Sequence, residues 1–118
     1  MNPMAITILI GILAGIVGGL LGVGGGIVMV PCFRYLLKFN MHLAVGTSLA
    51  ALALGGIAGA ARHALLGNVH WRTAAIIVLF VAAGSFFGAD LTQKISSAAL
   101  QRLFGIWMIG TGIYMLLK

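Results

Sequence analysis

Four glycines stand close together near the start of the chain, at Gly22, Gly24, Gly25 and Gly26, and Pro31 follows them. Glycine carries no Cβ, so a ligand or a second backbone can approach it closely. A helix that begins at such a cluster presents unpaired N–H groups and about half a positive charge. Groups of this kind bind anions without a charged side chain. The expected donors are the N–H groups of Gly24, Gly25, Gly26 and Ile27.

The cluster does not fit the two common nucleotide-binding motifs. A dinucleotide fingerprint requires glycine at position 27, where Ile27 stands, and a P-loop requires a Lys-Ser/Thr pair that is absent. A tight crossing of two helices that binds no ligand is the alternative interpretation.

A second candidate group is Gly46-Thr47-Ser48, whose hydroxyls are able to donate to an anion. Such hydroxyls in apolar helices also bond back to the preceding turn. Both interpretations stay open from the residues alone.

His63 is the candidate for proton coupling, because a histidine within an apolar segment exchanges protons near neutral pH. Asp90 is the one acidic residue, which argues against a carboxylate relay. We expect His42 and His70 to lie in solvated joints. The three histidines and Cys32 lack metal-ligand spacing, so no metal or other cofactor and no enzymatic activity is predicted.

The composition predicts an integral membrane protein of the cell membrane. The 118 residues are 62% hydrophobic and 7% charged, with a mean hydropathy of +1.19, whereas soluble domains carry about a quarter charged residues. The net charge of +6 comes from basic residues scattered singly between apolar runs, which argues against nucleic-acid binding. We expect one multi-pass domain over residues 1–118.

Four apolar segments predict an all-α fold with about four transmembrane helices: residues 4–37, 43–66, 73–89 and 99–117. The uncharged run Met1–Phe33 would form a helix of about 50 Å, against about 30 Å of bilayer hydrocarbon, so the first helix must break at the glycines. Either one tilted span is interrupted near the midplane, or Gly26–Lys38 enters separately as a half-helix. Polar backbone at membrane depth favours a binding role for the break.

Four stretches, in order along the chain, resemble the sulfite exporter TauE/SafE family of membrane permeases. These are GGLLGVGGGIVMVP (Gly18–Pro31), AVGTSLAA (Ala44–Ala51), RHALLGNVHWR (Arg62–Arg72) and LQRLFGIWMIGTGIYML (Leu100–Leu116). The resemblance implies transport of small sulfur-containing or organic anions such as sulfite or sulfonates. It singles out Gly22, Gly24, Gly25, Gly26, Pro31, Gly46, Thr47, Ser48 and His63. His70 stands where the family often has an acid.

Family members have about twice this length and two related halves, so the chain resembles one half. We therefore expect a homodimer in the lipid membrane, with the anion bound at the glycine-rich helix break. Four full crossings favour a dimer axis along the membrane normal, and a half-helix that changes the crossing count favours antiparallel pairing. A small anion channel and a half-subunit of a hetero-oligomeric transporter are the alternatives.

Overall fold

The computed structural model describes residues 2–22 and 26–118, and these form five helices. They are α1 (Pro3–Leu21), α2 (Gly26–Tyr35), α3 (Met41–Leu65), α4 (Trp71–Thr92) and α5 (Ser97–Leu117). Within the described residues, four helices are long and apolar enough to cross a membrane, and α2 is a shorter apolar helix. The prediction of an all-α fold with about four spans is confirmed.

Side-chain caps fix where four of the helices begin. Asn2 accepts the N–H of Ala5 at 2.7 Å, and Asn40 accepts that of Leu43 at 2.8 Å. The corresponding caps of α4 and α5 are His70 and Ser96. Each cap satisfies one of the four N–H groups that a helix start leaves without a partner.

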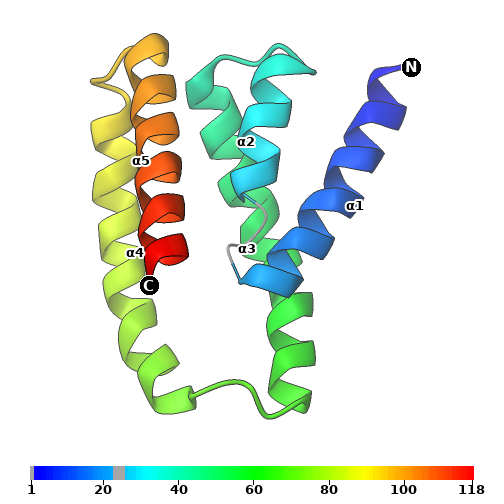
Figure 1. Cartoon of the computed structure of the whole chain (residues 1–118), viewed down its shortest axis with the longest axis vertical. Coiled ribbons are helices and arrows are strands. Elements are labelled where there is room, and N and C mark those ends of the chain that lie inside the picture. The colour runs from blue at the N-terminus through cyan, green and yellow to red at the C-terminus, as the bar shows by residue number, and fades with distance from the viewer. Residues whose placement is uncertain (1, 23–25) are drawn as a thin grey trace.

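The glycine cluster separates two helices that run in opposite directions (Figure 1). α1 ends at Leu21, and its C-cap is Gly22, which has φ 74° and donates its N–H to the Gly18 carbonyl at 2.8 Å. α2 begins at Gly26 and returns beside α1, which agrees with a separate half-helix and not with one interrupted span. It ends at Tyr35, before the expected Lys38. Gly24 and Gly25 lie outside the described residues.

The core lies among α1, α2 and α3. Its buried apolar residues are Ile10, Ala14, Met29, Val30, Phe33, Met41 and Ala44. α4 and α5 contain no buried residue. The molecule therefore consists of a packed three-helix unit and an α4–α5 hairpin that lies beside it (Figure 1).

Hydrogen bonds join the hairpin to the three-helix unit near the α2–α3 turn. The Arg34 Nε donates to the Gln101 Oε1 at 3.0 Å, and the backbone N–H of Met41 donates to the Ser97 hydroxyl at 3.0 Å. We call these bonds, together with those of His42 described next, the hairpin contact.

His42 contributes to the hairpin contact and is not solvated as the sequence led us to expect. Its Nε2 lies 3.0 Å from the Thr92 carbonyl and 2.7 Å from the Ile95 carbonyl. The Thr92 carbonyl also accepts the Ile95 N–H at 3.1 Å, so the His42 ring adds a second polar contact at the end of α4 and one to the α4–α5 turn. His70 is exposed as expected, and its Nδ1 accepts the N–H of Thr73 at 3.2 Å.

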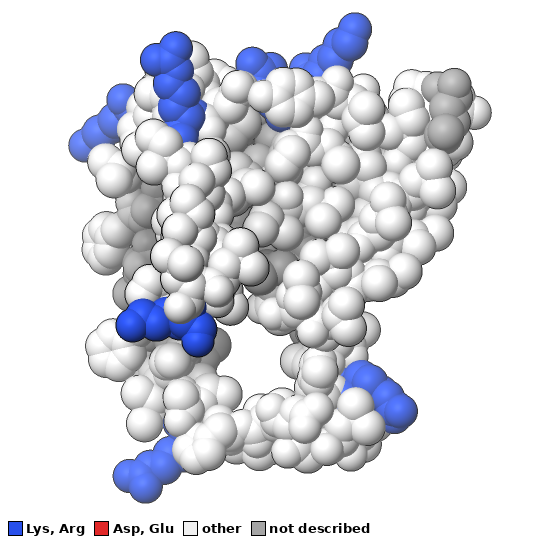
Figure 2. All heavy atoms as spheres, viewed as in Figure 1, with Lys and Arg blue, Asp and Glu red and all other residues white. Residues whose placement is uncertain are grey.

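The helix directions place the N-terminus at the same end of the molecule as the α2–α3 and α4–α5 turns (Figure 1). We call this the N-terminal end, and the α3–α4 turn marks the opposite end. Figure 2 shows Lys and Arg side chains toward both ends, with a broad uncharged surface between them. By position along the helices, the N-terminal end carries Arg34, Lys38, Lys94 and Arg102, and Arg62, Arg72 and Lys118 belong to the other half.

Candidate functional site

The first residue of α2 and the buried hydroxyl of α3 line the same cavity, of about 660 Å³. Gly26 is the first residue of α2, and Ser48 lies in α3 with 3% of its surface exposed. A Cβ built at Gly26 would lie 3.5 Å from the Leu52 side chain, which is ordinary contact. We call this space the α2–α5 cavity. It is lined by Gly26, Val30, Met41, Val45, Ser48, Leu49, Leu52, Leu100, Leu103, Phe104, Ile106 and Trp107.

The three residues of the Gly46-Thr47-Ser48 motif point in different directions around α3, and only Ser48 lines the α2–α5 cavity. The Ser48 hydroxyl donates to the Val45 carbonyl at 2.9 Å, so back-bonding, one of the two interpretations, holds for this residue. Its oxygen still has lone pairs and the hydrogen can rotate toward a ligand. Thr47 is half-buried and Gly46 is exposed, and neither lines the α2–α5 cavity.

Pro31 changes the backbone of α2 within the half-helix. Proline has no N–H, so the carbonyl of Ile27, four residues earlier, receives no helical hydrogen bond from it. Both residues are half-buried. The first turn of α2 therefore has two kinds of backbone group outside the regular helical pattern: the N–H groups at its start and the Ile27 carbonyl.

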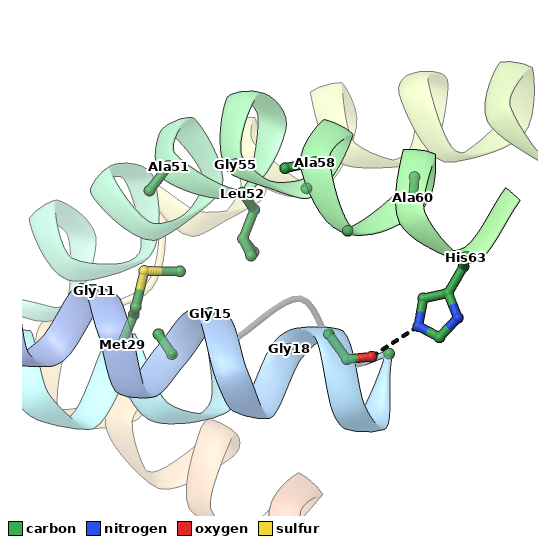
Figure 3. Close-up of a pocket in the computed structure, with 15 residues that line it drawn as sticks. Gly11, Gly15, Gly18, Met29, Ala51, Leu52, Gly55, Ala58, Ala60 and His63 are labelled. Carbon is green, nitrogen blue, oxygen red and sulfur yellow. Dashed lines mark hydrogen bonds between the residues drawn. The ribbon is translucent and has the colours of Figure 1, made fainter. Parts of the chain in front are cut away.

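Gly22 and His63 line a second cavity, of about 530 Å³, between α1 and α3. Its walls are mostly glycine and alanine, and Figure 3 shows Met29 and Leu52 projecting into the space between the two helices. We call it the α1–α3 cavity. It is lined by Gly11, Ala14, Gly15, Gly18, Gly19, Gly22, Met29, Ala51, Leu52, Gly55, Gly56, Ala58, Gly59, Ala60 and His63.

His63 connects the end of α1 to α3. Its Nε2 lies 2.8 Å from the Gly19 carbonyl, as the dashed line in Figure 3 marks. Its Nδ1 lies 3.2 Å from the Asn68 Nδ2, and Asn68 is exposed in the α3–α4 turn. The ring is half-buried. The structure thus brings His63 to the last turn of α1 before the helix break, while Ser48 lines the α2–α5 cavity together with Gly26.

Leu52 is the residue that the sequence analysis did not identify. It lines both cavities, and a side chain added at Gly26 would meet it at 3.5 Å. The signal that would have found it is its spacing: Leu52 follows Ser48 by four residues and therefore shares its helix face. An apolar residue at this spacing gives no chemical cue by itself, because most such residues only pack.

The family of the chain follows from comparison with known proteins. The family model described as sulfite exporter TauE/SafE matches residues 2–118. The chain belongs to this family. The family is one of membrane transporters and not of enzymes, and the protein is a multi-pass membrane protein.

Relatives in three organisms are each named as a probable membrane transporter protein. The Xylella fastidiosa protein is 38% identical over 116 residues, covering 98% of this chain and 44% of its own length. The Methanocaldococcus jannaschii protein is 33% identical, and the match covers 92% of this chain and 43% of that protein. A Bacillus subtilis protein is 34% identical, and the match covers 94% of this chain and 45% of that protein. The chain therefore spans less than half the length of these relatives, and no solved structure gives a significant match.

Proposed function

We propose that the protein transports small sulfur-containing or organic anions, such as sulfite or sulfonates, with the anion bound at the helix break. The observation that carries the proposal is the shared cavity of Gly26 and Ser48. An anion there would meet the N–H groups at the start of α2 and a hydroxyl donor from α3. Gly24, Gly25 and Ile27 are the neighbouring donors in this proposal, with Thr47 and Gly46 beside Ser48.

The charge at the helix start suits a singly charged ligand. A helix N-terminus carries about half a positive charge, so two copies of α2 facing one anion would supply about one elementary charge. Apolar side chains form most of the remaining wall, and they would exclude water and strengthen these interactions.

We propose that two copies act together in antiparallel orientation. α1 and α2 return to the N-terminal end, so α3, α4 and α5 make three passages after it (Figure 1). A second unit joined in tandem to such a unit would start from the opposite end and be inverted, and the relatives are about twice as long. Two separate copies reproduce that arrangement only if they insert in opposite directions. The basic residues at both ends are compatible with this.

The anion site is tested by sulfonate flux in proteoliposomes. Gly26→Leu should reduce the flux at least tenfold, because the longer side chain enters the α2–α5 cavity, whereas Gly26→Ala should retain it. Gly84→Leu is the control, because a Cβ at Gly84 in α4 meets no described residue within 4 Å. Unaltered flux in Gly26→Leu would remove the site, and flux that does not saturate would favour a channel.

The assembly is tested in nanodiscs by the mass of the complex and by a C-terminal reporter in cells. The proposal predicts two copies per complex and reporter signal on both sides of the membrane. A stable monomer would oppose the homodimer and favour a half-subunit that pairs with a different chain.

A further inference from the structure

We propose that His63 is a proton-binding site that holds the end of α1 against α3, so that proton binding and release control the width of the α1–α3 cavity. The part of this proposal that couples the proton to anion transport rests on the proposed function. The proton site itself rests on the contacts of the ring.

The first contact fixes one proton on the ring. The Nε2 lies 2.8 Å from the Gly19 carbonyl, and a carbonyl only accepts hydrogen bonds, so this nitrogen carries hydrogen. Gly19 belongs to the last turn of α1, where a helix does not itself supply a donor to every carbonyl. The His63 ring therefore supplies a donor that the end of α1 requires, and it does so from another helix.

The second contact suits either charge state of the ring. The Asn68 amide lies 3.2 Å from the Nδ1, and an amide offers a donor on one side and an acceptor on the other. With a neutral ring, the Asn68 NH₂ donates to Nδ1. When a proton from water binds Nδ1, rotation of the amide by half a turn lets Nδ1–H donate to its oxygen. Asn68 is exposed, so this rotation meets little resistance and water reaches the site.

Few charged or titratable groups lie near the His63 ring to exchange a proton with it. α1 carries no ionisable side chain, and the sequence has none from Asn2 to Pro31. Arg62 precedes His63 in α3 and is exposed, and His70 in the α3–α4 turn is engaged as the cap of α4. Asp90 lies toward the far end of α4. A proton bound by His63 is therefore not transferred to a neighbouring carboxylate, and the ring exchanges protons with water.

Protonation changes the strength of the contact between α1 and α3. A hydrogen bond from a charged ring to the Gly19 carbonyl is about twice as strong as one from a neutral ring. Most of the walls beside it are glycines and alanines, whose small side chains pack less than larger ones would. The bound proton thus strengthens the contact between α1 and α3 beside the α1–α3 cavity, and its release weakens this contact and lets the two helices move apart more easily next to Gly22.

The test measures the separation of α1 and α3 with spin labels, without any anion. Leu20→Cys and Leu54→Cys place labels on exposed positions of α1 and α3, in a Cys32→Ser background. From about pH 5 to about pH 9, the distance should lengthen and broaden, with the same midpoint as the ¹⁵N titration of His63. His63→Gln keeps a donor but binds no proton, and should abolish the pH dependence. His70→Asn, which keeps a helix cap, should retain it.

Two outcomes would overturn the proposal: a distance that does not change with pH, or the same change in His63→Gln. The transport arm uses an alkyl sulfonate, whose charge is constant over this pH range. His63→Gln should transport it without the pH dependence of the parent. If the parent moves no sulfonate but the label distance still follows His63, the proposed function fails and the proton site stands.

Discussion

Replacing Gly22 by alanine tests whether its backbone conformation ends α1. Gly22 has φ 74° and ψ 10°, which is left-handed, and a Cβ built there lies within 4 Å of none of the described residues. The substitution therefore adds no collision with the described part of the chain, and we attribute its effect to the backbone. Alanine in a left-handed conformation costs about 1–2 kcal/mol, a factor of about 5–30 in the equilibrium between folded and unfolded protein.

Gly15→Ala is the matched control within the same helix. Gly15 lies in the body of α1, and its Cβ would also lie more than 4 Å from every other residue that the structure describes outside its own helical turn. In a helix interior, alanine is favoured over glycine by up to about 1 kcal/mol. The two substitutions thus have opposite signs, and we expect free energies of unfolding that differ by about 2–3 kcal/mol. Gly22→Asn should fall between them, because asparagine tolerates the left-handed region better than alanine does.

The measurement is reversible unfolding in mixed micelles of a mild detergent and dodecyl sulfate, followed by circular dichroism. The free energies of the three variants are compared at one detergent composition. Equal stability of Gly22→Ala and Gly15→Ala would refute the reasoning. It would mean that α1 ends for a reason other than the left-handed residue.

Two further predictions concern Leu52 and the hairpin contact. Leu52 lines both cavities, so we expect its side chain to keep them apart. Leu52→Ala should therefore raise the uncoupled leakage of sulfonate in proteoliposomes several-fold, and Leu52→Trp should lower the sulfonate flux. Equal leakage in the two variants would contradict the idea that Leu52 separates the cavities. For the hairpin contact, a double-mutant cycle of Arg34→Ala and Gln101→Ala should give a coupling free energy of about 1 kcal/mol in detergent unfolding, and purely additive effects would show that the 3.0 Å bond does not stabilise the hairpin.

The beginnings and ends of helices were predictable because their signals are local. Gly26 starts α2 as the glycine cluster indicated, and Asn40 caps α3 with its own side chain. The length of the uncharged run against the bilayer thickness required a break, and the break is present. Ser48 was also predictable as a candidate, since the hydroxyl motif has a recognisable sequence.

The packing between helices was not predictable in the same way. A helix for the membrane is apolar on all sides, so its sequence does not show which face meets a neighbour. Leu52 and His42 show the consequence, since each owes its role to contacts far away in sequence. The direction in which α2 leaves the glycine cluster likewise depends on its packing against α1 and α3.

The α4–α5 hairpin buries no side chain, and the hairpin contact lies at one end of it. A helix of 22 residues is about 33 Å long, slightly more than the hydrocarbon of an average bilayer. Leu100 and Phe104 of α5 pack against the core, so the tilt of the hairpin depends both on this packing and on the hydrocarbon thickness of the surrounding lipids. Since α5 forms one wall of the α2–α5 cavity, the width of that cavity becomes a property of the lipid as well as of the protein.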